Sequence, residues 1–451
     1  MKRHTRILAA AASTAVVLAL AACAPGTGAP NGKDADDTKI SKDIAAEGDV
    51  TLTVWDQEVR GGQNEQMEQL NAAFEDKYPN VTINRVSQAF DDLNTTLRLA
   101  LTDKDAPDVV QANNGRNTMG AFVKAGQLRN LDDYAELYGW KDRFPESVLQ
   151  YSTYGEDAVD FGTGSIYGLP QVGEVVGVFY SKSKLAELGA EVPADWAEFQ
   201  SVLDTAHAKG ERPLVLGNID KWPAIHVFGP IQGDFVDADT IRDLGLGNSG
   251  ADWKTDDNVA AAQQLADWSA GGYFNDGPNG TDYDAAWQSF STGAGTFLIG
   301  GSWLGADLED AMGDDVGFFV PNTSAGIPAT TGGTGLPFAI TSAASNNNVA
   351  AAYLDFITSD DAMAILAETG NMPVNGSAGL APAGGVQADI FTEFGRVTEK
   401  GALLPYLDYA TPTFSDTLGD ALQGLIAGQL SAAEFTELLN ADYSEFVSSN
   451  G

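Results

Sequence analysis

The side chains best suited to binding in this sequence directly follow two of its apolar runs. Trp55 and Asp56 end one run, and Asn113 and Asn114 follow another. Because open α/β sheets bind ligands at the carboxyl ends of their strands, these four side chains are candidates for one site. A tryptophan ring stacks on an apolar face, while carboxylate and amide groups accept or donate hydrogen bonds. This combination suits a sugar, which carries hydroxyl groups around apolar C–H faces.

Trp303 is the strongest single candidate for an aromatic ligand contact. It follows two glycines and a serine at 300–302, after a predicted strand, and glycine lets a bound molecule approach the backbone closely. Each candidate also has an ordinary alternative: core packing for Trp55, capping or solvation for Asp56, and turn formation for the asparagine pair. The tryptophans that we expect only to pack are Trp140, Trp196, Trp253, Trp268 and Trp287.

Strand-like and helix-like segments alternate along the chain and would position these side chains. Predicted strands cover 50–55, 81–83, 108–111, 175–180, 213–216, 295–299, 316–320 and 335–340. Predicted helices cover 63–77, 90–102, 117–125, a segment from about 195, 256–270, 284–292, 346–358, 360–368, 387–399, 415–427 and 431–448. Such alternation predicts an α/β fold with mainly parallel sheets. The pattern restarts near residue 175, which favours two lobes in tandem with added helices.

The composition excludes several classes of function. The chain has 451 residues with 63 acidic and 25 basic side chains, a formal net charge of −38. Such a charge repels nucleic acid and anionic lipid. One cysteine allows no intramolecular disulfide, and three histidines disfavour histidine-rich metal sites and Ser–His–Asp triads. Carboxylate pairs arise by chance among so many acids, so they do not indicate a glycosidase. We therefore expect no catalytic residues, no cofactor and no metal.

The N-terminal segment has the pattern of an export signal. Three basic residues precede an apolar run of sixteen at 7–22, which is short for a spanning helix of roughly 20 residues. The run ends at Leu20-Ala21-Ala22-Cys23, which resembles the bacterial lipobox, whose cysteine carries the lipid. We expect a signal peptide at 1–22 and lipidation of Cys23, with a buried thiol as the alternative. The stretch 23–48 is small, polar and rich in Gly, Pro and Asp, which predicts a flexible tether.

Six segments in order resemble the extracellular solute-binding proteins of bacterial ABC importers, in the family 1 carbohydrate-binding branch. The resemblance covers about 49–445 and rests on Trp55-Asp56, on 106–115 with 125–128, on 167–170 with 178–182, on 192–199, on 290–297 with 300–303, and on 332–335 with 350–357. It implies a two-lobed, type II periplasmic-binding-protein-like fold, with lobes joined by hinge strands that close on a ligand.

The resemblance also implies lobe boundaries and further site residues. The N-terminal lobe would hold 49–172 and 340–372, and the C-terminal lobe 178–335 and 376–451. Glu174 lies beside the first crossing between lobes, Gly333 precedes the second, and Trp222 lies in an exposed-looking loop that would face the cleft. The expected ligand sites are thus Trp55, Asp56, Asn113, Asn114, Glu174, Trp222, Trp303 and Gly333.

The function implied by this resemblance is ligand binding without any covalent reaction. The protein would bind an oligosaccharide between its lobes, as a monomer held by lipid at the extracellular face of the cell membrane, and deliver it to the permease subunits. Two alternatives stay open. A secreted carbohydrate-active hydrolase would need two positioned carboxylates, and a binder of peptides or polyamines would show cleft carboxylates without stacking rings.

The single cysteine gives a prediction about localisation. One acyl chain anchors a protein only marginally, whereas two anchor it stably, so a diacylated Cys23 should keep the protein with the membrane fraction. Replacing it (Cys23→Ala) should release the protein to the soluble fraction. Fractionation of cells that express each form measures this, and equal membrane retention of both forms would contradict lipidation.

Overall fold

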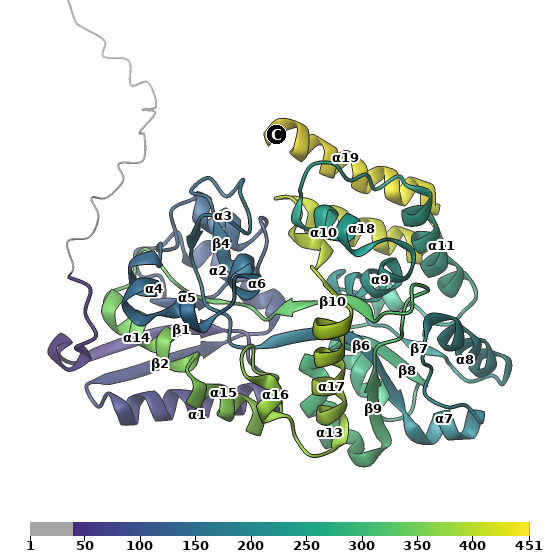
Figure 1. The fold of residues 1–451 in the computed structure, drawn as a ribbon, viewed down its shortest axis with the longest axis horizontal. Helices are drawn as coiled ribbons and strands as arrows, with labels where there is room; N and C mark the ends of the chain where they lie inside the picture. The colour runs from purple at the N-terminus through teal and green to yellow at the C-terminus, as the bar shows by residue number, and fades with distance from the viewer. Residues whose placement is uncertain (1–38, 451) are drawn as a thin grey trace, which may run out of the picture. The chain divides into compact units, whose positions relative to one another are not determined.

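Two β-sheets with helices around them organise the chain (Figure 1). A computed structural model describes residues 39–450, and residues 41–450 fold as one unit. The predicted signal peptide at 1–22, the cysteine at 23 and the tether up to residue 38 lie outside the described residues.

The first sheet has the strand order β11-β3-β1-β2. Its strands are β1 Val50–Asp56, β2 Val81–Ser87, β3 Val109–Gln111 and β11 Phe338–Ile340. Strand β1 pairs in parallel with β2 and β3, and β11 is antiparallel to β3. Alternate residues of β1, beginning with Leu52 and Val54, are buried, because successive side chains of a strand point to opposite faces.

The second sheet has the order β12-β10-β6-β8-β7, with β9 also paired to β6. Its strands are β6 Gly173–Ser181, β7 Leu214–Val215, β8 Phe297–Gly301, β9 Val316–Phe319, β10 Ala329–Thr334 and β12 Ala402–Leu404. Strand β6 is antiparallel to β8, β9 and β10. The prediction of mainly parallel pairing is therefore right for the first sheet and wrong for the second. The pairing is antiparallel because the chain in β6 runs away from the junction of the two sheets, whereas in β10 it runs back toward that junction.

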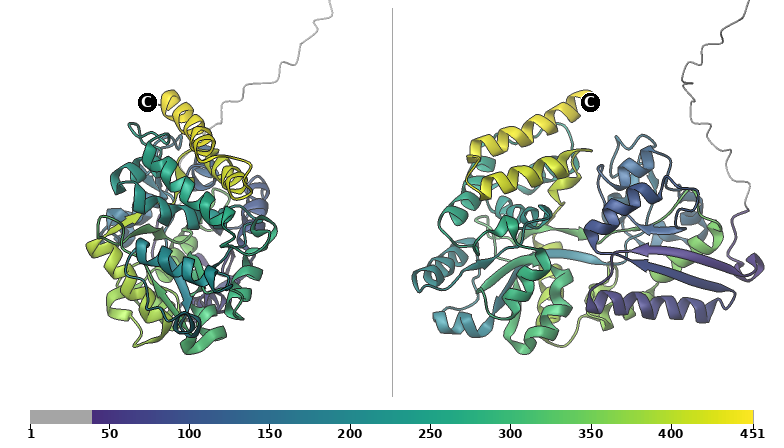
Figure 2. Two further views of the ribbon diagram at one scale, coloured as in Figure 1. Left: turned by 90° about the vertical axis from the view of Figure 1, so that its right-hand side faces the viewer. Right: turned by 180° about the vertical axis from the view of Figure 1, so that it is seen from behind.

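Three chain segments cross between the two sheets and are hydrogen-bonded to one another. Gly173 N donates to Met372 O, Val374 N donates to Gln171 O, and Gly335 N donates to Val172 O, each at 2.9 Å. Strand β10 belongs to the second sheet and β11 to the first, so the chain passes from one to the other between residues 334 and 338. Seen from behind in Figure 2, the middle of the molecule is spanned by these strands.

Helices cover both sheets. On the side of the first sheet they are α1 Gly61–Lys77, α2 Phe90–Ala100, α3 Met119–Lys124, α4 Asp132–Tyr138, α5 Trp140–Arg143, α6 Glu146–Leu149, α14 Asn347–Ile357 and α15 Asp360–Glu368, beside a small hairpin of β4 Thr153–Tyr154 and β5 Ser165–Ile166. On the side of the second they are α7 Lys182–Leu188, α8 Trp196–Ala208, α9 Trp222–Phe235, α10 Ala238–Leu246, α11 Asp256–Ala270, α12 Tyr283–Ser291, α13 Gly305–Met312, α17 Gly385–Lys400, α18 Phe414–Ile426 and α19 Ala432–Asn450. Helix α16 Ser377–Leu380 contacts both α15 and α17.

Helix α9 was missed by the sequence analysis, which placed Trp222 in a loop. Trp222 is instead the first residue of this helix. Proline is tolerated in a first turn, as at Pro223, but Pro230 lies inside the helix and normally breaks one. Tertiary packing overrides that preference: a Cβ at Gly229 would lie 2.4 Å from Cγ2 of Thr331 in β10, so the helix lies directly on the strand.

Residues 41–48, which the sequence analysis places in the tether, lie against the body. Ile44 is 1% exposed and sits in a short 3₁₀ helix, Ile44–Glu47. The side chain of Asn80 donates to Ile44 O at 2.9 Å, and that of Asn346 donates to Oε2 of Glu47 at 2.9 Å. Burial of Ile44 and these hydrogen bonds hold the segment in place, so the folded body begins near Ser41.

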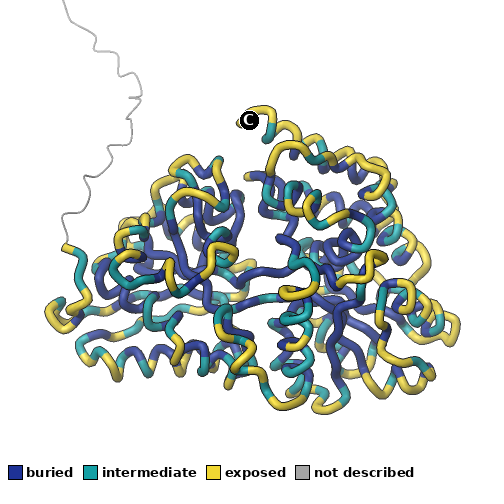
Figure 3. The backbone as a smooth tube through the Cα atoms, viewed as in Figure 1, coloured by how far each residue is buried: buried dark blue, intermediate teal, exposed yellow. Residues whose placement is uncertain are grey.

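The buried interior follows the two sheets (Figure 3). Trp140, Trp196, Trp253 and Trp268 are at most 8% exposed, which confirms the prediction that they pack in the core. Trp287 is half-buried on α12, and its Nε1 donates to Oδ1 of Asp284 at 2.9 Å. Among the described residues, no helix combines the length and apolar character needed to cross a bilayer.

Candidate functional site

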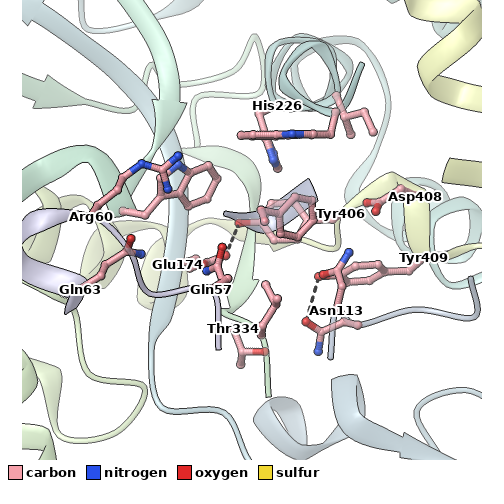
Figure 4. A pocket seen from close by; sticks show the side chains of 16 residues that line it. Gln57, Arg60, Gln63, Asn113, Glu174, His226, Thr334, Tyr406, Asp408 and Tyr409 are labelled. Carbon is pink, nitrogen blue, oxygen red and sulfur yellow. Dashed lines mark hydrogen bonds between the residues drawn. The ribbon is translucent and has the colours of Figure 1, made fainter. Parts of the chain in front are cut away.

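A cavity lies where the two sheets meet, next to the crossing segments (Figure 4). Its first wall comes from segments that follow the strands of the first sheet. Gln57 follows β1, Arg60 and Gln63 are at the start of α1, and Asn113 and Asn114 follow β3. The carboxyl ends of parallel strands meet at one edge of a sheet, which brings together side chains from distant parts of the chain.

Two residues of this wall are held by specific partners. Asn114 Nδ2 donates to Tyr151 O at 2.8 Å, which fixes the direction of its amide. The guanidinium of Arg60 forms a salt bridge of 2.9 Å to Asp284, which lies in α12 on the other side of the cavity. Arg60 is therefore already neutralised by a protein carboxylate.

The second wall is aromatic. The ring of His226 in α9 lies 5.6 Å from that of Trp222, 5.1 Å from Trp303 and 5.0 Å from Tyr406, all in edge-to-face arrangements. Trp303 Nε1 donates to the hydroxyl of Tyr283 at 2.7 Å, so the polar edge of the indole is satisfied within the protein. Such a wall offers rings for stacking on apolar faces.

Gly301 sets the position of the Trp303 ring. A Cβ at residue 301 would lie 2.0 Å from the indole, so the ring rests directly on the glycine backbone at the end of β8. Any other residue at this position would displace the ring from its place. The glycine before Trp303 thus allows a close approach, but the group that approaches is the protein's own tryptophan.

The floor of the cavity carries polar groups from the crossing strands. Glu174 in β6 accepts a hydrogen bond from the hydroxyl of Tyr406 at 3.0 Å. Thr334 at the end of β10 also lines the cavity, and within residues 39–450 its buried hydroxyl oxygen has no hydrogen-bond partner. Glu58 lies behind the first wall, 3% exposed, and accepts from Gln111 Nε2 at 2.7 Å.

Burial controls the charges of this site. Burial, with a smaller contribution from the neighbouring Glu58 carboxylate, raises the pKa of Glu174 to about 7, against the hydrogen bond from Tyr406. Burial likewise raises the pKa of Glu58 to about 7 and that of Asp408, beside Tyr409, to about 6. Burial lowers the pKa of His226 to about 3, so its ring is neutral at physiological pH. The cavity and the wall behind it therefore hold carboxyl groups that exchange protons near neutrality.

The structure brings Asn113, Asn114, Glu174, Trp222 and Trp303 of the predicted site residues to the lining of this one cavity. Trp222 lies at its rim, where its ring contacts Phe90 of α2 with centroids 5.8 Å apart. These side chains come from strands, loops and a helix on both sides of the cavity. Together they provide amides, a carboxyl group and two indole rings.

Trp55, Asp56 and Gly333 do not line the cavity. Trp55 lies in β1 between Val86 and Val110 and packs against the core. Asp56 is fully buried and bonded to Nε and Nη2 of Arg85 at 2.6 and 2.8 Å. Gly333 pairs with Glu174 in the sheet. Their ordinary structural roles are thus visible in the fold.

Sequence reasoning missed His226, Tyr406, Asp408 and Tyr409, which all line the cavity. The last three follow β12, a strand that the sequence analysis did not predict. The run Pro405-Tyr406-Leu407-Asp408-Tyr409 carried a usable signal, because it alternates aromatic and acidic residues much as Trp55 and Asp56 do. Within residues 39–450, no group of His, Cys, Asp and Glu side chains is arranged to hold a metal ion.

Comparison with known proteins identifies the family. The sequence profile described as bacterial extracellular solute-binding protein matches residues 60–364. This chain belongs to that family. It is 27% identical over 149 residues to the multiple sugar-binding protein of Streptococcus mutans, covering 33% of this chain and 32% of that protein. It is 26% identical over 210 residues to a probable sugar-binding periplasmic protein of Rhizobium meliloti, covering 39% and 48%. The matches thus span a third to a half of these relatives.

Solved structures of other binding proteins share the fold. A chitin oligosaccharide binding protein superposes with a TM-score of 0.75 and 22% identity, covering 88% of this chain and 99% of that one. A maltose-bound protein of Thermotoga maritima, described as T. maritima MalE3, gives 0.70 and 18%, covering 88% and 99%. These likenesses confirm the two-lobed, type II periplasmic-binding-protein-like fold expected from the sequence.

The buried pair of Asp56 and Arg85 predicts a stability effect. Removing one partner of a buried ion pair typically costs about 3–5 kcal/mol, so Asp56→Asn should lower the free energy of unfolding by an amount of this order. Asp105→Asn is the matched control, because Asp105 pairs with Lys104 at a site where both side chains are more than three-quarters exposed, and such pairs contribute about 0–1 kcal/mol. Urea denaturation measures both. Equal stability of the two variants would contradict a structural role for Asp56.

Glu174 predicts a pH dependence of stability. Its pKa rises from 4.5 to about 7 on folding, so between these values the folded state binds more protons than the unfolded state, and stability falls as pH rises. Glu174→Gln removes this loss. Relative to the wild type, the free energy of unfolding of the variant should increase as the pH rises from 4.5 to 7. Above pH 7 the difference between the two proteins should stay constant. Denaturation curves from pH 4.5 to 8 measure this, with Glu437→Gln on the exposed face of α19 as control. Parallel curves for wild type and Glu174→Gln would refute the assignment.

Proposed function

We propose that this chain is the substrate-binding lipoprotein of a bacterial ABC sugar importer. It captures an oligosaccharide in the cavity between its lobes and delivers the sugar to the permease subunits. It changes no covalent bond. The observation that carries this proposal is the pairing of an aromatic wall, with Trp222 and Trp303, against amide and carboxyl groups on the facing wall and floor.

The chemistry of the cavity supports a sugar over a peptide or a polyamine. Stacking rings match the apolar faces of a pyranose, and amides and carboxyl groups match its hydroxyls. Curated relatives are named for sugar binding, and solved neighbours are described as binding chitin oligosaccharide, raffinose or maltose. These descriptions belong to those proteins, and their agreement in ligand class supports the same class here.

The proposal includes the arrangement of the whole chain. The N-terminal lobe holds 49–172 and 340–372, and the C-terminal lobe holds 178–335 and 376–451. A signal peptide at 1–22 is removed, and lipid on Cys23 holds the monomeric protein at the extracellular face of the cell membrane. The site residues of the proposal are those of the cavity, with Trp55, Asp56 and Gly333 kept as expectations from the sequence.

One observation keeps a hydrolase as the second candidate. Glu174 and Asp408 both line the cavity, and burial raises the pKa of both. A glycosidase needs two carboxyl groups on either side of the scissile bond. The two functions differ in their products, since a binding protein returns the sugar unchanged and a hydrolase shortens it.

A sugar panel tests the proposal. Purified protein is heated with maltotriose, raffinose, chitotriose, xylotriose and galactose, with spermidine as a non-sugar ligand, and the mixtures are then separated by chromatography. We expect a raised melting temperature with at least one sugar, none with spermidine, and no shortened product. Stabilisation by spermidine alone would overturn the sugar assignment, and shortened sugars formed in proportion to protein would indicate a hydrolase.

Trp303→Ala tests the aromatic wall. Fully burying a large apolar side chain contributes roughly 1.5–3 kcal/mol, and about 1.4 kcal/mol corresponds to a tenfold change in affinity. The variant should therefore bind the panel sugar about 10- to 100-fold more weakly, as measured by calorimetry. Trp287→Ala is the matched control, because Trp287 is half-buried outside the cavity. A Trp303→Ala protein that melts much earlier than wild type yet binds with unchanged affinity would show that Trp303 only packs.

A further inference from the structure

We propose that Arg116 is a latch that holds the two lobes in the closed arrangement around the bound sugar. The inference rests on the proposed function, since it concerns how the binding protein keeps its ligand. Arg116 does not line the cavity, so it acts on the ligand only through the positions of the lobes. It is a positioning residue whose contacts lie outside the site.

Arg116 is anchored first within its own lobe. It follows β3 and is 5% exposed. Its Nε and Nη2 both donate to the carbonyl oxygen of Val159, at 3.1 and 2.9 Å. Its guanidinium also lies 5.4 Å from the ring centroid of Phe161. Both partners belong to the segment around the β4–β5 hairpin, so these contacts fix the direction of the side chain.

The remaining donor crosses to the other lobe. Arg116 Nη1 donates to Leu246 O and to Ala410 O, each at 2.7 Å. Leu246 is the last residue of α10, where carbonyl groups lack helical partners and the helix dipole favours a positive charge. The guanidinium also lies 4.7 Å from the ring of Phe446 in α19. One side chain thus binds an α10 terminus, the segment after Tyr409 and the face of α19.

Because Arg116 is a buried cation, its contacts with the other lobe are needed to stabilise its charge. Burial lowers its pKa to about 10, so it stays a cation at neutral pH. Among the described residues Arg116 forms no direct ion pair. Carbonyl oxygens, two ring faces and the nearby Asp160 carboxylate compensate its charge. A buried cation that loses such partners is costly. If the lobes separate, Nη1 loses both carbonyls at once and the guanidinium loses one of its two rings.

The surfaces on either side of the latch fit closely. A Cβ at Gly115, whose φ is +88°, would lie 2.8 Å from Cδ1 of Tyr409. A Cβ at Gly247, whose φ is +69°, would lie 2.8 Å from Arg116 Nη1. Both positions need glycine for their backbone conformation and also for the approach of the facing lobe. The lobes therefore meet at Arg116 through backbone and ring contacts with no space for larger side chains.

Other contacts between the lobes include those of α1 with α13 and of Phe161 with Tyr409, and two further contacts involve the cavity itself. The salt bridge of Arg60 with Asp284 and the contact of Trp222 with Phe90 both involve cavity-lining residues. Replacing those residues would change sugar contacts and closure together. Arg116 does not line the cavity, so replacing its side chain tests closure more directly than those changes do.

Two variants and one control test the latch. Arg116→Met removes the charge and all donors. Arg116→Lys keeps the charge, but a single ammonium does not reproduce the planar fork that reaches Val159 O and the two carbonyls of the other lobe. Arg143→Lys is the control, because Arg143 also lies partly buried and binds Asp355, both on the side of the first sheet. All three should lower the melting temperature without sugar, so stability alone does not decide.

The deciding measurement is the dissociation rate of the panel sugar that gives the largest thermal shift with wild type. Closure slows escape, so Arg116→Met should raise this rate about tenfold and Arg116→Lys by less, with a smaller change in the association rate. Arg143→Lys should leave it unchanged. A dissociation rate for Arg116→Met equal to that of wild type, or raised equally in Arg143→Lys, would overturn the latch.

Lobe separation is measured independently of affinity. Spin labels at Leu99→Cys on α2 and Leu438→Cys on α19, both exposed positions, report the distance between lobes in a Cys23→Ala background that removes the native thiol. Arg116→Met should populate longer distances than wild type, with or without sugar. Identical distance distributions would overturn the latch. If no panel sugar binds wild type, the proposed function fails, and this distance comparison alone decides for or against the latch.

Discussion

The hydrogen bonds that join the three crossing segments are the constraint on which the rest of this structure depends. Gly335 and Met372–Val374 each bond to Gln171–Gly173 through backbone groups, so the three segments pass between the lobes side by side. Backbone pairing fixes the pivot but leaves the facing surfaces of the lobes to side chains. Strands β6 and β10 begin and end at this pivot, which places Glu174 and Thr334 on the floor of the cavity. Any motion of the lobes therefore turns about the same residues that would meet the ligand.

Burial at this pivot explains the electrostatic character of the site. Polar groups in a low-dielectric environment interact strongly, and unpaired ones are costly. Several ionisable groups of the cavity avoid this cost by being uncharged or paired. His226 is held uncharged among three rings, and the carboxyl group of Glu174 keeps its proton up to about neutral pH. Arg60, the cation of the first wall, is already paired with Asp284. Such a site suits the neutral, hydroxyl-rich ligand proposed above, while Asp408, with a pKa of about 6, is largely ionised at neutral pH.

The sequence predicted those parts of the fold that depend on local pattern. The helix at 256–270 and the strand at 50–55 were predicted correctly, and the structure shows the Thr255 cap and the acidic first turn that favour α11 locally. Helix α9 was missed because Pro230, Gly229 and Gly233 all argue against a helix locally, and only packing on β10 overrides them. Antiparallel pairing in the second sheet was missed for a related reason: strand direction follows from the path of the whole chain.

The site residues also divide into those that local sequence indicates and those whose setting depends on the fold. Asn113, Asn114, Glu174, Trp222 and Trp303 carry types and positions that point to binding, and they meet at one cavity. Asp56 has an equally suitable type, yet Arg85 on the neighbouring strand takes its carboxylate. Nothing in the residues around Asp56 indicates this, because the partner is set by the pairing of β1 with β2. His226 and Tyr409 were missed for the converse reason, since their setting comes from helix α9 and the turn after β12.

Closure of this protein involves contacts both inside and outside the cavity. A ligand shifts an equilibrium between open and closed lobes only by its difference in affinity for the two. The cavity contacts contribute to that difference when a sugar is bound, whereas Arg116 contributes whether or not the cavity is filled. A latch outside the site thus changes how long any ligand stays without changing which ligand is chosen. On the proposed function, selection belongs to the rings and carboxyl groups of the cavity. Retention belongs to a buried cation outside the cavity, where α10, the turn after β12 and α19 converge on the loop after β3.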